Sequence, residues 1–175
     1  MTSVSNIEEA ALDRPVRTFA SSAGAVLRHA ELMTSAESGS SGFHPLTARQ
    51  CEDLLASQRA GRVAWNAADG PLVLPVTYRM YTGEVVFRTS PYGVLSQLVE
   101  PTNVAFEIDE VDQESGVGWS VVVRGRARAV THADDLAKLW VMDGLVPWAT
   151  GTRNLFVGIT PHSIRGRAVE APFAD

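Results

Sequence analysis

The sequence has a single cysteine, Cys51, so an internal disulfide is excluded. It also lacks a strongly apolar segment behind a basic N-terminus, which is the pattern of a secretory signal. Arg, Asp, Glu or Gly interrupts every apolar run before it reaches the roughly 20 residues that a membrane-spanning helix needs. Together these absences predict a soluble protein of a reducing, cytoplasmic compartment.

Positive charge is also scarce. The 15 Lys and Arg residues against 20 Asp and Glu residues give a formal net charge of −5 and a pI near 5.4. Such a chain has no field that would attract nucleic acid or an anionic membrane surface. With 175 residues, 45% of them hydrophobic, the chain is long enough for one buried core and too short for two ordinary domains.

The usual signatures of catalytic and metal sites are missing. The sequence has no GxSxG elbow, no Walker loop and no GxGxxG segment after an expected strand. The histidines, at positions 29, 44, 132 and 162, are not spaced as metal ligands, so no metal site is predicted. No catalytic residue is assigned, and Cys51 is predicted to be inert because it has no basic neighbour that would clearly lower its pKa.

The first 44 residues differ in composition from the rest. They are rich in Ala, Ser and Thr and close with the flexible string SAESGSSG, so residues 1–44 are predicted to be a poorly ordered tail. Met33 is an alternative start of the chain. Residues 45–175 are predicted to form the folded domain.

Within this domain the apolar periodicity predicts few helices and many strands. Thr47 and Gln50 have the spacing of a capping box, which predicts a helix that ends near Gly61. Alternation predicts strands over 61–67, 72–80, 84–90, 103–112, 118–130, 155–160 and 163–171, the last two on either side of Pro161. Short helices are expected over 94–100 and, capped by Thr131, over 133–142. This order is typical of a mainly β fold, an antiparallel barrel in which closure removes exposed strand edges.

Three arginines alternate along the strand expected over 118–130. Arg124, Arg126 and Arg128 share one face at period two, and Trp119 lies on the other, core-facing side. Two interpretations stand: cross-strand pairing with Glu107 and Asp109, or binding of an anion by one of the arginines.

The segment FRTSPYGVLSQL offers a second candidate site. Arg88, Thr89 and Ser90 end a strand, and a helix begins near Val94 after a turn. A guanidinium, two hydroxyls and a helix N-terminus are suited to a phosphate group. An ordinary strand-to-helix turn has the same composition, so spacing alone leaves both interpretations open.

Four segments, VLPVTYRM, VVFRTSPYG, VAFEIDEVD and GWSVVVRGRARAV, occur in an order and spacing that resemble the pyridoxamine 5'-phosphate oxidase-like FMN-binding proteins. With the closing ITPHSIRGR the similarity spans roughly Leu46 to Ala168, and the nitroimidazole-resistance-like branch is the nearest. The resemblance implies an FMN-binding split β-barrel and a homodimer with one FMN in each of two clefts between subunits.

The resemblance also assigns roles to particular residues. Arg88 and Thr89, with Ser90 beside them, would hold the flavin phosphate. Pro75, Val76 and Thr77 would lie along the isoalloxazine ring. Trp119 and Ser120, with Trp148 from the second subunit, would line the cleft; a place in the dimer interface fits Trp148 equally well. Trp65 and Trp140 are assigned to the core.

One departure bears on the cofactor. Relatives often carry a Ser-Lys pair at the start of the helix where this chain has Gly93 and Val94, which removes a charged partner of the phosphate. The first hypothesis is an FMN-dependent oxidoreductase acting on a small molecule. The alternatives are a deazaflavin-dependent reductase and a non-catalytic dimeric protein that binds a flavin or haem.

Overall fold

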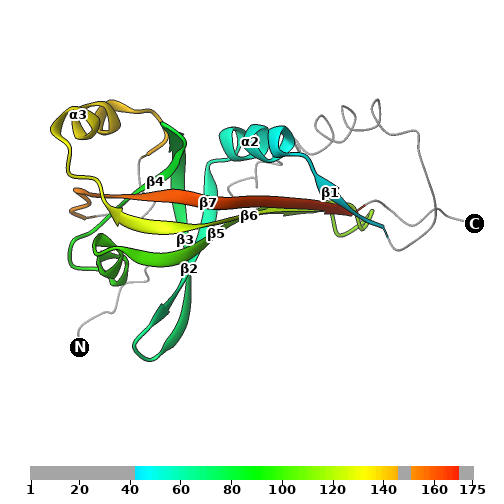
Figure 1. Cartoon of the computed structure of the whole chain (residues 1–175), viewed down its shortest axis with the longest axis horizontal. Coiled ribbons are helices and arrows are strands. Elements are labelled where there is room, and N and C mark those ends of the chain that lie inside the picture. The colour runs from blue at the N-terminus through cyan, green and yellow to red at the C-terminus, as the bar shows by residue number, and fades with distance from the viewer. Residues whose placement is uncertain (1–41, 146–150, 170–175) are drawn as a thin grey trace, which may run out of the picture. The chain divides into compact units, whose positions relative to one another are not determined.

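The structure is a computed structural model that describes residues 42–145 and 151–169. All of these residues belong to one compact unit of the chain, Ser38–Asp175. Its elements, shown in Figure 1, are β1 (Phe43–Leu46), α2 (Ala48–Ser57), β2 (Ala60–Ala67), β3 (Gly70–Tyr81), β4 (Glu84–Thr89), the 3-10 helix η1 (Val94–Val99), β5 (Thr102–Val111), β6 (Gly118–Ala129), α3 (Ala133–Val141) and β7 (Leu155–Val169). Sequence analysis did not foresee β1, which begins at Phe43 within the expected tail and ends just before the helix expected from Thr47. Residues 1–41 of the expected tail lie outside the described residues.

The strands form a ring, which confirms the expected antiparallel split barrel. Their order is β1-β7-β4-β3-β2-β5-β6, and a further pairing of β6 with β7 closes the sheet. β6 pairs along one edge of β7. On the other edge, β4 pairs with Leu155–Ile159 and β1 pairs with Gly166–Val169. Between these two pairings, residues 160–165 of β7 pair with no described strand on that edge.

β7 runs without interruption through Pro161, so the expectation of two separate final strands was wrong. Arg124 of β6 pairs with Ser163 and Gly125 pairs with Pro161, which leaves His162 as the extra residue of a β-bulge. Proline lacks the N–H that a regular ladder needs and is tolerated at such a bulge. The bulge therefore allows one long strand where the sequence indicates a break.

α2 begins with a local capping box and is joined to the barrel interior by a hydrogen bond from Tyr78. Its capping box is present as expected: the Gln50 N–H donates to the Thr47 hydroxyl, and the Thr47 N–H donates to the Gln50 side chain. The buried Tyr78 hydroxyl donates to the Leu55 carbonyl oxygen at 2.7 Å. The Tyr78 ring in turn packs edge-on against Phe106, with ring centroids 4.7 Å apart. Trp65 is buried, as expected of a core residue.

α3 covers the outer face of the barrel. Leu139 and Leu145 pack with Val86 and Phe156 in a cluster separate from the interior. Two expectations about this helix were wrong. Its N-cap is His132 rather than Thr131, and no side chain caps it. Trp140 is 53% exposed, because only one side of a helix on an outer face is covered.

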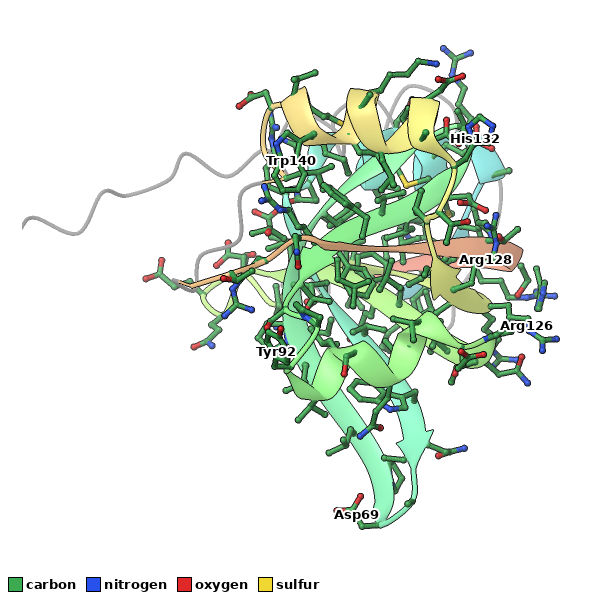
Figure 2. The ribbon with its side chains drawn as sticks, turned by 90° about the vertical axis from the view of Figure 1, so that its left-hand side faces the viewer. Asp69, Tyr92, Arg126, Arg128, His132 and Trp140 are labelled. Carbon is green, nitrogen blue, oxygen red and sulfur yellow. The ribbon has the colours of Figure 1, made fainter. Side chains whose placement is uncertain are left out.

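The arginines of β6 are exposed, as the alternation predicts, but their expected partners were wrong. Arg124 lies opposite Ala105, whereas Glu107 lies opposite Val122. Asp109 instead pairs with Arg62 of β2. Arg128 pairs with Glu84 of β4 at 3.0 Å. Figure 2 shows Arg126 and Arg128 on the same side of the barrel, with their side chains projecting outward.

The β2–β3 hairpin extends away from α2 and α3, with Asp69 at its tip (Figure 2). Val73 on its second strand is 57% exposed, so the hairpin presents apolar surface. Neither of the two described α-helices, nor η1, is long and apolar enough to cross a membrane.

Candidate flavin site

The residues predicted to lie along the flavin ring occupy the middle of β3. Pro75 is exposed and lies opposite Arg62, whereas Val76 and Thr77 are 6% and 8% exposed. Successive side chains of a strand point to opposite faces, so Pro75 and Thr77 share a face and Val76 points away from it. The strand thus presents the side chains of Pro75 and Thr77, and the backbone between them, to one ligand.

Arg88 is held in a fixed orientation at the end of β4. Its Nε donates to the Arg153 carbonyl, and its guanidinium carbon lies 4.0 Å from the centre of the Trp140 ring. The Phe156 ring lies further away, at 5.5 Å from the same carbon. The two terminal nitrogens of Arg88 form no hydrogen bond within the described part of the chain. A guanidinium held in this way presents its free edge to an anion at little cost in side-chain entropy.

Thr89 and Ser90 are placed differently from Arg88. Thr89 is 2% exposed. Because successive side chains of a strand alternate, its side chain and that of Arg88 point to opposite faces of the sheet. The Ser90 hydroxyl accepts the Tyr92 N–H at 3.2 Å, and its carbonyl accepts the Gly93 N–H at 3.3 Å. The turn therefore already uses two of the N–H groups that could have bound a phosphate. The helix that follows is the short 3-10 helix η1.

Trp119 and Ser120 lie at the beginning of β6. Trp119 is 3% exposed, and its indole N–H has no hydrogen-bond partner among the described residues. Both residues line a pocket of about 320 Å³ to which Phe43 and Arg167 also contribute. The Arg167 Nε donates to the Ser120 hydroxyl at 3.4 Å. A buried donor without a partner beside a pocket marks a place where a ligand acceptor would be stabilised.

One copy of the chain does not bring all these residues together. Arg88 pairs with Phe156 near the start of β7, whereas Trp119 pairs with Ala168 near its end. The intervening length of β7 corresponds to roughly 40 Å of extended strand. Curvature shortens this distance. Even so, the β4 set, which contains Arg88, and the β6 set, which contains Trp119 and Ser120, lie at opposite ends of β7. Trp148, the remaining predicted site residue, lies outside the described residues.

Two contributors to the site were missed by sequence analysis. Trp140 and the Arg153 carbonyl orient Arg88, yet Trp140 was assigned to the core and Arg153 carries no motif. Only the arrangement of α3 over β4 and β7 places these residues around Arg88, so spacing in the sequence carries no signal for them.

Comparison with known proteins identifies the family. The family model for pyridoxamine 5'-phosphate oxidase matches residues 47–168. An uncharacterised protein of Mycobacterium tuberculosis is 32% identical over 123 residues, which cover 67% of this chain and 80% of that protein. Among solved structures, a candidate pyridoxamine 5'-phosphate oxidase from Corynebacterium glutamicum superposes with a TM-score of 0.65 at 29% identity, covering 78% of this chain and all of the other. The FAD-binding protein from Mycobacterium smegmatis superposes with a TM-score of 0.61 at 32% identity, covering 72% and 98% of the two chains.

The fold and the matched segment define a split barrel of the pyridoxamine 5'-phosphate oxidase type. This chain belongs to the pyridoxamine 5'-phosphate oxidase family.

Proposed function

We propose that the protein is a flavin-dependent oxidoreductase that works as a homodimer, with each flavin bound between two copies. The observation that carries this proposal is the separation of the β4 set, with Arg88, from the β6 set, with Trp119 and Ser120. Both sets carry groups suited to one ligand, and two copies related by a twofold axis bring the set of one against the set of the other.

Arg88 is the proposed anchor of the flavin phosphate. Its stacking on Trp140 and its bond to the Arg153 carbonyl leave the terminal nitrogens for phosphate oxygens. Thr77 and Pro75 of the neighbouring strand β3 would lie along the ring. From the partner copy, Ser120 and the Trp119 N–H, which has no hydrogen-bond partner among the described residues, would complete the cleft.

A bound flavin would supply hydride chemistry at its ring, so the protein need not provide a nucleophile. This suits the absence of a recognisable catalytic constellation from the sequence. The role left to this chain is to position the flavin, stack a small planar substrate against it and exclude water from the cleft.

The turn before η1 favours a second candidate, a dimer that binds a flavin or haem without turnover. Val94 stands where relatives often carry the lysine of a Ser-Lys pair, and it is 49% exposed. Tyr92, two residues earlier in the turn, is 91% exposed. The described residues of this turn offer the phosphate no cation, so Arg88 is the charged group of this strand end. The same loss is compatible with FAD or a deazaflavin in place of FMN.

The test is the visible absorption spectrum of the purified protein before and after FMN, FAD and a deazaflavin are added and gel filtration removes unbound ligand. Flavin bands that stay with the protein support the proposal, and identification of the released molecule distinguishes FMN from FAD. If the protein retains only the deazaflavin, the cofactor is a deazaflavin and not FMN or FAD. Protein that stays colourless with every flavin would refute the proposal. Bound flavin that is reduced by no donor would favour the second candidate.

A further inference from the structure

Two arginine side chains converge beside the turn that follows α3. Gly144 in this turn has a φ of +79°, and a Cβ added there would lie 1.8 Å from Arg79 Nη2 and 2.5 Å from Arg59 Nη1. The two guanidinium groups therefore lie within a few ångströms of each other. They approach a backbone position that glycine alone leaves open, both in φ and in space.

The chain holds Arg79 in place through its backbone contacts. Nε of Arg79 donates to the Asp143 carbonyl and Nη1 donates to the Tyr78 carbonyl, each at 3.0 Å. The remaining nitrogen, Nη2, is buried and has no hydrogen-bond partner among the described residues. Arg59 is tied to the same strand, because its carbonyl accepts the Tyr78 N–H at 3.0 Å.

Among the described residues, neither charge has a carboxylate partner in an ion pair. The ion pairs formed by the described residues join Arg49 to Asp53, Arg62 to Asp109, Arg128 to Glu84 and His132 to Asp135, and none includes Arg59 or Arg79. Two like charges at this distance repel, and an unpaired buried N–H adds to the cost. An anion between the two guanidinium groups would offset their repulsion and accept a hydrogen bond from the unpaired N–H.

The chemistry of the pair selects the class of ligand. Guanidinium groups donate paired hydrogen bonds to two oxygens of a carboxylate, which is planar, or of a phosphate, which is tetrahedral. Arg79 follows Thr77 by two residues on β3, so both side chains leave the same face of the strand. The arginine pair is therefore next to the residues expected along the flavin ring. Val86, the β4 residue opposite Arg79, precedes Arg88 by two residues, so Arg88 lies on the same side of the sheet.

We propose that Arg59 and Arg79, converging at Gly144, form an anion-binding site for a phosphate or carboxylate group of the substrate. The assignment to the substrate rests on the proposed flavin function, whereas the anion site itself does not. The substrates to be sought are accordingly small acidic or phosphorylated molecules.

The test uses inorganic phosphate as the probe and calorimetry on flavin-free protein, with potassium chloride at matched ionic strength as the reference. Arg59→Ala and Arg79→Gln are each expected to weaken phosphate binding by at least about tenfold. Arg49→Ala on α2 is the matched control and is expected to bind as the unaltered protein does, because Arg49 is exposed and forms an ion pair with Asp53. Equal phosphate binding by all four proteins, or binding no stronger than that of chloride, would overturn the proposal.

A second arm separates the substrate from the cofactor as the source of the anion. Phosphate is titrated into protein loaded with FMN and, separately, into protein loaded with riboflavin, which has no phosphate. Binding in both cases supports a substrate site. Binding that is lost with FMN but kept with riboflavin assigns the arginines to the cofactor phosphate and overturns the substrate assignment. If no flavin binds, the proposed function fails, while the flavin-free titration still decides whether the arginine site exists.

Discussion

The guanidinium carbon of Arg88 lies 4.0 Å from the centre of the Trp140 ring, so α3 directly supports a β4 residue placed in the candidate flavin site. Trp140 also packs edge-on against Phe156, with centroids 5.6 Å apart. Phe156 is the β7 residue opposite Arg88. The helix, the two strands and the arginine thus form one small cluster. A substitution in α3 that removes this contact should change the orientation of the Arg88 guanidinium.

The first prediction concerns this stacking pair. Trp140→Ala should lower the free energy of unfolding by about 1 kcal/mol, because it removes a half-exposed cation–π contact and an aromatic pair. In a double-mutant cycle with Arg88→Ala, denaturant unfolding should give a coupling energy of about 0.5–1 kcal/mol. Trp140→Ala should also weaken flavin binding, since Arg88 loses its orientation. Additive losses in stability would show that the stacking is not energetically significant.

The second prediction concerns Tyr78, which joins β3 to α2. Tyr78→Phe removes the hydrogen bond to the Leu55 carbonyl and should cost about 1–3 kcal/mol, because a buried acceptor loses its donor. Tyr81→Phe is the control: its hydroxyl bonds to Asp135 at the surface, so the loss should be smaller. Equal losses in urea unfolding would contradict the account.

Tyr78 also gives a pH dependence. Burial raises the pKa of its hydroxyl above the ordinary value of a tyrosine. Above about pH 10 the unfolded chain loses this proton while the folded chain keeps it. Tyr78 should therefore contribute stability at lower pH that is lost in the alkaline range. In Tyr78→Phe, the fall in stability above that pH should be shallower, which unfolding measured across the alkaline range would detect.

The third prediction concerns Cys51. The thiol is 1% exposed, and burial is the main cause that raises its pKa. A thiol reagent should therefore label the native protein more than about tenfold slower than the protein in denaturant. The rate of absorbance change with a chromogenic disulfide gives the comparison. Rapid labelling of the native state would contradict the burial of α2 against the barrel.

The fourth prediction concerns close packing at Gly61. A Cβ there would lie 2.3 Å from a ring carbon of Phe106 and 2.6 Å from the Glu107 carbonyl oxygen. Gly61→Ala should therefore destabilise the fold by about 1–3 kcal/mol through overpacking. At Gly93 an added Cβ meets nothing closer than 3.8 Å, so Gly93→Ala serves as the control. Midpoints of thermal unfolding that fall equally in both variants would argue against this packing.

Local patterns predicted most of the strands because alternation and turn residues act over a few positions. The capping box at Thr47 and the meander of β2, β3 and β4 are of this kind. The expected break at Pro161 was wrong, because a bulge at His162 of the same strand accommodates the proline, and that bulge depends on the register of β7 with β6. The exposure of Trp140 was also missed, since periodicity shows that a helix has one apolar side but not which aromatic lies at its margin.

The candidate site was less predictable than the fold. Arg88, Thr89 and Ser90 are consecutive in the sequence, yet alternation and the turn send their side chains in different directions. The Arg59 and Arg79 pair is invisible in the sequence, because it depends on the path of the chain at Gly144. The separation of Arg88 from Trp119 depends on the register of β7 with β4 and β6.

Subunit complementation tests the central claim, a flavin site shared between two copies, most directly. Arg88→Ala and Ser120→Trp should each abolish flavin binding alone, but mixed dimers of the two variants keep one intact site. An equal mixture refolded together should therefore regain about a quarter of the flavin bound by the unaltered protein. Mixing Arg88→Ala with Pro75→Trp, whose altered residues belong to the same half of the site, should regain none. Recovery in the first mixture alone is the predicted result; no recovery there, with both variants folded and dimeric, would contradict the account.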